Sequence, residues 1–165
     1  MPTYSLVAFK GEDSLKGSIE YSHGEVHLIY DWQDHPLSKE ETPALGESIR
    51  KVGLWEDTCF EAFFLQENGE YQEWNFSLTG AWNAFQFLSY RKARDPWEIP
   101  SLNPPQILRE REKERLVITF ESLPFKAFQL SAVIANKELE YYAISHPQSK
   151  ADFHSLDHFT PWSPQ

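Results

Sequence analysis

Short segments in which apolar and polar residues alternate make up most of this chain, and turn residues separate them. Alternation with a period of two is typical of β-strands, because successive side chains point to opposite faces of a sheet. We expect about ten strands, and the pattern predicts an antiparallel all-β domain. The expected strands span residues 4–10, 17–21, 25–32, 58–65, 71–78, 81–90, 106–112, 115–122, 128–135 and 138–144.

Two stretches depart from the alternating pattern. Residues 43–52 begin with Pro43 after a possible N-cap, Thr42, and they carry apolar residues at helical spacing before Gly53, which predicts one short helix. Residues 95–105 are rich in proline and are expected to be irregular.

Ten strands with little helix predict a two-sheet antiparallel β-sandwich, of jelly-roll or immunoglobulin-like type, in preference to a closed barrel. A chain of 165 residues is one ordinary domain and buries roughly two-thirds of its unfolded surface. No fixed-period repeat or linker divides it, so we expect a single domain over residues 1–165.

Glu61 lies in the middle of an otherwise apolar strand, TCFEAFFL. A buried charge costs several kcal/mol unless it is paired, so this side chain must point away from the core or have a partner. The turn that follows this strand indicates the direction of the Glu61 side chain. A three-residue loop with Gly69 in the left-handed conformation pairs Glu61 with Asn75 and Phe63 with Glu73.

In that register Glu61, Glu73 and Asn75 share one face of the hairpin, because directly opposed residues lie on the same side of a sheet. A two-residue turn at Asn68-Gly69 would instead slip the register by one and place aromatic residues beside Glu61. The residues expected to face the core are Phe60, Ala62, Phe64, Trp74 and Phe76.

The next hairpin extends the polar face. A two-residue turn at Thr79-Gly80 places Trp82 opposite Ser77 and adds an indole to the two acids and the amide. Sugars present hydroxyl groups to carboxylates and amides and C–H faces to aromatic rings, so this set resembles a sugar site. The alternative is an ordinary solvent-facing sheet surface.

A second group of polar residues lies in SHPQSKADFHSLDHF, near the C-terminal end of the sequence. Histidines and carboxylates at short spacing can bind a transition metal, contribute to a ligand pocket, or serve only as local hydrogen-bonding groups. The sequence leaves these three roles open. The group comprises His146, Asp152, His154, Asp157 and His158.

Charge and cysteine content narrow the function further. The formal net charge of −10 argues against nucleic acid as a partner, and the basic run at residues 91–94 is expected to be a solvated strand end. Cys59, the single cysteine, is expected to be buried without a disulfide. The sequence shows no export signal and no long apolar window, which predicts a cytoplasmic protein that does not bind membranes.

Three segments, GLWEDTCFEAFF, YQEWNFSLTGAWNAFQFLSYR and YYAISHPQSKADFH, resemble the bacterial DOMON-like family, which is related to family 9 carbohydrate-binding modules. The resemblance covers most of the chain from residue 53 onward. It implies a β-sandwich whose relatives bind sugars or haem, with no established catalytic residues in this branch. The matching positions are Trp55, Thr58, Cys59, Glu61, Tyr71, Glu73, Asn75, Ser77, Trp82, Arg91, His146, Asp152 and His154.

The leading hypothesis is a non-enzymatic module that holds a small sugar or sugar derivative on the concave polar face, with the late loop closing over it and no cofactor. The expected ligand-binding residues are Glu61, Glu73, Asn75, Trp82, Arg91, His146, Asp152 and His154.

Three competing hypotheses stand beside it. The first is a glycoside-processing enzyme. Glu61 and Glu73 would be diagonal neighbours about 7 to 8 Å apart, within the spacing of inverting glycosidases. The second is haem binding through a histidine pair, and the third is a structural or protein-interaction module without a small ligand.

Overall fold

The computed structural model describes residues 1–33, 35, 37 and 44–163, and twelve strands in these residues form one antiparallel sheet. The order is β7-β6-β5-β4-β10-β11-β1-β2-β3-β9-β8, with β12 paired to β10. The strands are β1 (Thr3–Ala8), β2 (Ser14–Ser22), β3 (Glu25–Asp31), β4 (Cys59–Leu65), β5 (Tyr71–Ser77), β6 (Trp82–Ser89), β7 (Lys92–Glu98), β8 (Gln106–Glu110), β9 (Arg115–Glu121), β10 (Ala127–Ala135), β11 (Leu139–Ala143) and β12 (Thr160–Pro161).

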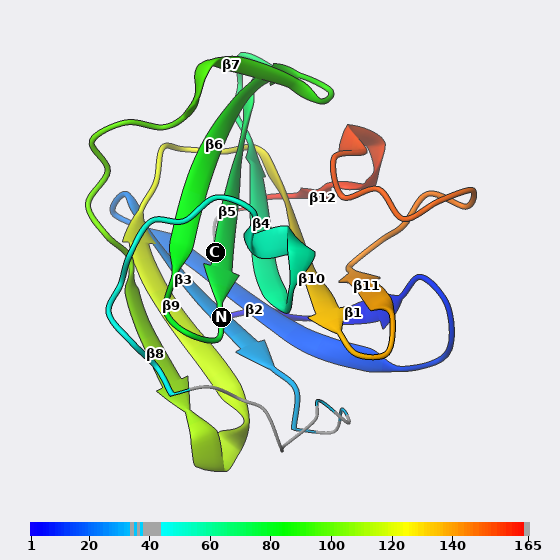
Figure 1. Ribbon diagram of the computed structural model, residues 1–165. Helices are drawn as coiled ribbons and strands as arrows, with labels where there is room; N and C mark the ends of the chain where they lie inside the picture. Colours follow the sequence, from blue (N-terminus) through cyan, green and yellow to red (C-terminus); the bar gives the residue numbers. More distant parts are fainter. Residues whose placement is uncertain (34, 36, 38–43, 164–165) are drawn as a thin grey trace.

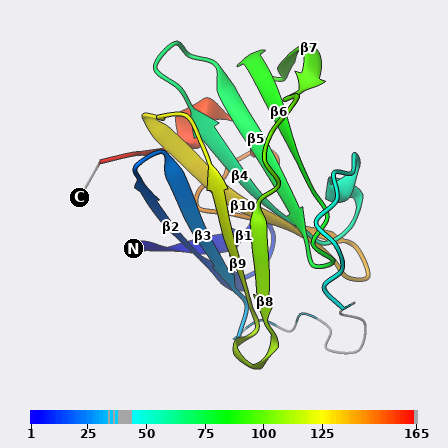
Figure 2. The same cartoon turned by 90° about the vertical axis from the view of Figure 1, so that its left-hand side faces the viewer.

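The continuous sheet folds over on itself, so that β4, β5 and β6 lie in one layer and β2, β3, β9 and β8 in the other (Figures 1 and 2). Aromatic side chains fill the space between the layers. The ring of Phe120 on β9 lies 4.2 Å from that of Trp74 on β5, and Tyr30 on β3 lies 5.0 Å from Phe60 on β4. The prediction of an all-β, sandwich-like fold is confirmed, although the two layers belong to one sheet.

The β4–β5 hairpin has the predicted register. Gly69 adopts a φ of +87°, and the Gln66 N–H donates to the Glu70 carbonyl at 2.9 Å, which closes the three-residue loop. Glu61 therefore lies opposite Asn75, and Phe63 opposite Glu73. The residues expected to face the core all lie in the main apolar cluster: Phe60, Ala62, Phe64, Trp74 and Phe76.

The register predicted for β6 is wrong by one residue. The loop contains three residues, Leu78 to Gly80, and the Ser77 N–H donates to the Ala81 carbonyl at 2.9 Å. Trp82 consequently pairs with Phe76 and points into the main core, where it is 1% exposed. The loop repeats the geometry of the previous turn, with Gly80 at a φ of +90°, and it buries Leu78 in the core. This burial supplies a physical reason for the longer loop.

The expected helix does not form over residues 44–52, and residues 42 and 43 lie outside the described part of the chain. The segment instead runs beside β6, where the Gly46 N–H donates to the Thr79 carbonyl at 2.8 Å and the Lys51 N–H to the Trp82 carbonyl at 2.9 Å. A single short helix is marginal without packing, whereas these backbone partners are available at the sheet. Helical structure in the described residues consists of 3-10 turns at η1 (Leu54–Glu56), η2 (Arg111–Lys113) and η3 (Leu156–His158).

Part of the proline-rich stretch forms a strand, contrary to expectation. Strand β7 pairs with β6 through an irregular register that joins Phe87 to Ala93 and Phe85 to Glu98. Its Pro96 is tolerated because β7 is an edge strand and needs no hydrogen bond on its free side. The register shifts bring Trp97 onto Phe85, with ring centroids 4.4 Å apart.

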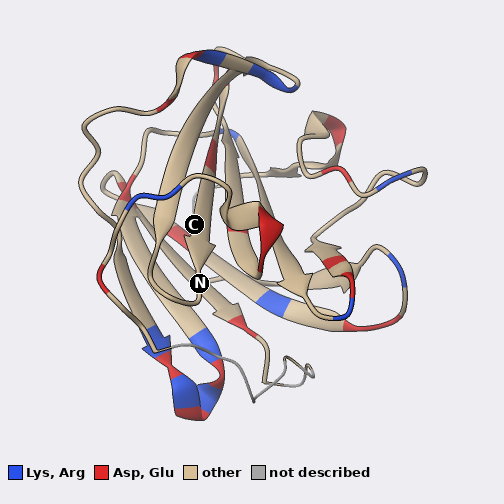
Figure 3. Ribbon diagram, viewed as in Figure 1, with Lys and Arg blue, Asp and Glu red and all other residues tan. Residues whose placement is uncertain are grey.

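Basic residues gather at two places, along β7 and around the β8–β9 turn, which lie at opposite ends of the view in Figure 3. Each group lies beside acids: Arg94 pairs with Glu70 at 3.2 Å, and Arg115 pairs with Glu110. No helix in the described part of the chain is both long and apolar enough to cross a lipid bilayer.

Candidate functional site

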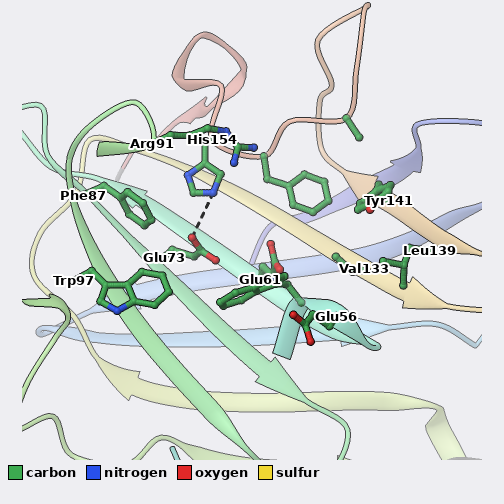
Figure 4. A pocket seen from close by; sticks show the side chains of 13 residues that line it. Glu56, Glu61, Glu73, Phe87, Arg91, Trp97, Val133, Leu139, Tyr141 and His154 are labelled. Carbon is green, nitrogen blue, oxygen red and sulfur yellow. Dashed lines mark ion pairs between the residues drawn. The ribbon is translucent and has the colours of Figure 1, made fainter. Parts of the chain in front are cut away.

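A pocket of about 530 Å³ opens on the outer face of the β4–β5–β6 layer, opposite the main core. Figure 4 shows the carboxyl groups of Glu61 and Glu73 between Phe87 and Trp97 on one side and Leu139 and Tyr141 on the other. Strand alternation places Glu61, Glu73 and Phe87 here, because each lies on the face opposite the core residues of its strand. The lining residues are Trp55, Glu56, Glu61, Glu73, Phe87, Arg91, Trp97, Val133, Leu139, Tyr141, Ala151, Phe153 and His154.

Two carboxyl groups form the floor of this pocket. Glu61 is 3% and Glu73 is 7% exposed, and the Asn75 amide nitrogen donates to Glu73 Oε1 at 3.1 Å. Burial raises the pKa of Glu73 to about 7. Burial, followed by repulsion from Glu73, raises the pKa of Glu61 well above its ordinary value. Near neutral pH the pair therefore retains protons that exposed glutamates would have lost.

His154 covers the floor from the C-terminal loop. Tyr71 Oη accepts the Arg91 backbone N–H at 3.0 Å and lies 2.7 Å from His154 Nδ1, within hydrogen-bond distance. His154 Nε2 faces Glu73 Oε2 at 3.5 Å (Figure 4). Burial, with a contribution from Arg91, lowers the pKa of His154 to about 4, so the imidazole is neutral at pH 7 and this contact is not an ion pair.

Arg91 lies at the rim and already has a counterion. Its Nη2 contacts Asp152 Oδ1 at 2.9 Å, and Asp152 also accepts hydrogen bonds from the Tyr90 hydroxyl and the His154 backbone N–H. Although burial opposes it, these hydrogen bonds and the Arg91 charge hold the pKa of Asp152 below its ordinary value. The charge of Arg91 is thus balanced by Asp152 rather than by the two floor carboxyls.

Aromatic rings form the wall of the pocket. Trp97 stacks on Phe85 and meets Trp55 edge-on at 6.2 Å, and it remains 38% exposed. On the far side Tyr141 is 37% exposed. The flat apolar surfaces of the wall are therefore accessible from solvent, and the polar groups lie deeper in the pocket.

The structure brings together some of the predicted site residues and separates others. Glu61, Glu73, Arg91 and His154 line the pocket. Asn75 and Asp152 lie one contact behind it, bound to Glu73 and Arg91 respectively.

Trp82 and His146 do not line the pocket. Trp82 lies in the main core because of the register shift described above. His146 instead packs against Phe9 at 5.4 Å, and its Nε2 lies 2.8 Å from the Val7 carbonyl oxygen, so the expected closure of the loop by this residue is wrong.

The remaining residues of the late loop make local contacts. His158 Nδ1 lies 2.9 Å from the Ser145 hydroxyl. Among the residues that the structure describes, no group of three or more His, Cys, Asp and Glu side chains is arranged to hold a metal ion. Within this loop, His154 lines the pocket, whereas His158 makes a local hydrogen-bond contact.

Sequence reasoning missed most of the aromatic wall. Trp97 lies in the stretch expected to be irregular, and its direction depends on register shifts that no alternating pattern reveals. Trp55 was identified within a motif but not as a site residue, because it lies in the 3-10 turn η1 rather than on a strand. The six tryptophans in the sequence indicated that more than one indole could contact a ligand, but the number alone could not identify which ones.

Comparisons of the chain with protein-family models, with curated proteins and with solved structures found no match.

Proposed function

We propose that this protein is a non-enzymatic module that binds a small sugar or sugar derivative in the pocket above Glu61 and Glu73. The observation that carries the proposal is the placement of two buried carboxyl groups beneath exposed aromatic faces in one cavity. Its volume of about 530 Å³ lies within the range of roughly 300 to 1,000 Å³ found for small-ligand sites.

The chemistry of the two surfaces suits a sugar ring. The C–H face of a pyranose can stack on the exposed indole of Trp97, while hydroxyl groups reach the floor. A carboxyl pair that holds a proton near neutral pH can both donate and accept, which matches the hydroxyl group, itself a donor and an acceptor. The resemblance of the sequence to DOMON-like and family 9 carbohydrate-binding modules agrees with this proposal.

Calorimetric titration of the protein with a panel of monosaccharides tests it. Trp97→Ala should weaken binding about 2- to 12-fold, as expected for loss of an aromatic contact worth about 0.5 to 1.5 kcal/mol. Leu108→Ala is the matched control, because Leu108 is 56% exposed on β8 in the other layer. Equal losses in both variants, or no binding by any sugar, would count against the proposal.

A second candidate is a glycoside-processing enzyme, favoured by the placement of Glu73, with a pKa of about 7, beside Glu61 and a neutral His154. Carboxyl groups with shifted pKa values are typical of acid–base catalysis. However, burial raises the pKa of both acids, whereas glycosidases keep one carboxylate ionised. Hydrolysis of aryl glycosides that is lost in both Glu61→Gln and Glu73→Gln would establish the enzyme; binding without turnover would support the module.

Haem fits the pocket residues poorly. His154 is the one histidine among the described lining residues, and its two ring nitrogens face Tyr71 and Glu73. An axial ligand would have to break the contact to one of them. A titration with haem that yields an absorption band dependent on His154 would restore this hypothesis.

A further inference from the structure

Carboxyl groups outnumber cationic side chains around the pocket. Its lining contains three glutamates, Glu56, Glu61 and Glu73, and a single basic side chain, Arg91. Arg91 is held by Asp152 at 2.9 Å, so it gives the floor only a distant field. Two carboxyl groups therefore lie buried next to each other without a cation of their own among the described residues.

We infer that the ligand carries a protonated primary amine, as in an amino sugar, and that its ammonium group binds between Glu61 and Glu73. This inference rests on the proposed function and specifies the ligand class of the same site. It supplies from the ligand the positive charge that the chain does not place on the floor.

Aromatic side chains favour an organic cation over a metal ion at this position. Five of the thirteen lining residues are aromatic: Trp55, Phe87, Trp97, Tyr141 and Phe153. Ring faces attract ammonium groups and also contact their carbon framework, whereas hard metal ions need six or more oxygen ligands or retained water. The pocket thus offers an ammonium group two carboxyl partners and an apolar surround.

Hydrogen-bond donors distinguish a primary amine from a quaternary one. A primary ammonium carries three N–H donors and can bridge carboxyl oxygens from two adjacent strands, whereas a quaternary ammonium has none. Asn75, which lies one contact behind the floor, has a buried Oδ1 that accepts no hydrogen bond from the described residues. The site is therefore rich in acceptors, which a ligand with several donors would satisfy.

Binding of such a ligand should release a proton. Burial and mutual repulsion keep the empty carboxyl pair partly protonated near neutral pH, and an ammonium group between the two favours the ionised form. Affinity should consequently rise with pH over the range in which the pair loses its proton. A neutral sugar, which gains nothing from ionisation, should show no such rise.

The experiment compares 6-amino-6-deoxyglucose and 2-amino-2-deoxyglucose with glucose and N-acetylglucosamine, by calorimetry at pH 5.5 and pH 7.0 in two buffers of different ionisation enthalpy. At least one amino sugar should bind tenfold or more tightly than glucose at pH 7.0, bind more tightly than at pH 5.5, and release a proton. Glu61→Gln and Glu73→Gln should each abolish the preference for the amine. Glu67→Gln, an exposed change of the same charge in the β4–β5 turn, should retain it.

The outcomes separate this inference from the proposed function. Equal affinity for glucose and the amino sugars, or amine binding without proton release, overturns the ammonium site while the sugar-binding proposal stands. Binding by none of the four sugars overturns both. Because the ligand comparison uses the unaltered protein, it decides the inference even if a glutamine variant folds poorly.

Discussion

Ionisation of Glu73 inside the folded protein should carry a measurable cost. Burial raises the pKa of this carboxyl group from 4.5 to about 7. The folded state thus binds the proton more tightly than the unfolded chain, so stability falls as pH rises from about 4.5 to about 7 and the loss stays constant above that range. Glu73→Gln replaces the acid with a neutral amide of the same shape, which can still accept the hydrogen bond from Asn75.

The magnitude follows from the two pKa values. Each pH unit between them is worth about 1.4 kcal/mol, so an ionised Glu73 lowers the free energy of unfolding by about 3 kcal/mol. Between pH 5 and pH 8 the linkage relation predicts that the wild-type protein loses roughly 2 to 3 kcal/mol of stability that Glu73→Gln keeps. Stabilisation by Glu73→Gln is expected, because residues of a binding site often lower the stability of the folded protein.

Urea unfolding at pH 5, 6.5 and 8 measures this difference. The stability of Glu73→Gln relative to wild type should grow steadily with pH, and the exposed control Glu67→Gln should show a flat difference. A Glu73→Gln difference that stays within about 0.5 kcal/mol across the range would mean that the carboxyl group ionises freely in the folded protein. That result would refute the buried-acid description of the pocket floor.

Three further substitutions test the packing and the turns, each by urea unfolding. Phe64→Ala should lower the free energy of unfolding by about 3 to 5 kcal/mol, because the ring is buried between the layers; a loss below about 1 kcal/mol would contradict this placement. Gly80→Ala should cost about 1 to 2 kcal/mol, since its left-handed backbone disfavours a side chain and the added Cβ would lie 3.3 Å from the Gly46 carbonyl oxygen; an unchanged midpoint would argue against the three-residue loop. Tyr71→Phe should cost about 1 to 3 kcal/mol by removing the hydroxyl that binds His154; a neutral effect would indicate that water replaces it.

Local sequence determined the β4–β5 hairpin and the positions of the two floor carboxyl groups. The loop before Glu70 contains a glycine at the position that needs a left-handed backbone, so turn chemistry favoured the three-residue loop over a two-residue turn at Asn68-Gly69, and the structure has the predicted register. Once the register was fixed, strand alternation decided which side chains face the core and which face the pocket. A stretch of sequence shorter than twenty residues therefore sufficed to place Glu61 and Glu73 on the face opposite the core.

The same reasoning failed one hairpin later, because two turns were compatible with the sequence around Gly80. A two-residue and a three-residue loop differ little in local energy, and burial of Leu78 in the main core distinguishes them. Leu78 is buried by residues far away in the chain. The sequence around the turn therefore could not show that Trp82 faces the core, and the tertiary structure decided it. A register shift of one residue moves every side chain of a strand to the opposite face of the sheet.

Tertiary structure also decided the wall and the cover of the pocket. Residues 44–52 have helical spacing, yet their backbone binds that of the β5–β6 loop and β6. Trp97 faces the site through the irregular pairing of an edge strand, and His154 covers the floor while His146, eight residues earlier, binds β1. Alternation and turn chemistry are local and can be deduced from sequence, whereas the approach of segments distant in the chain depends on the packing of the whole fold.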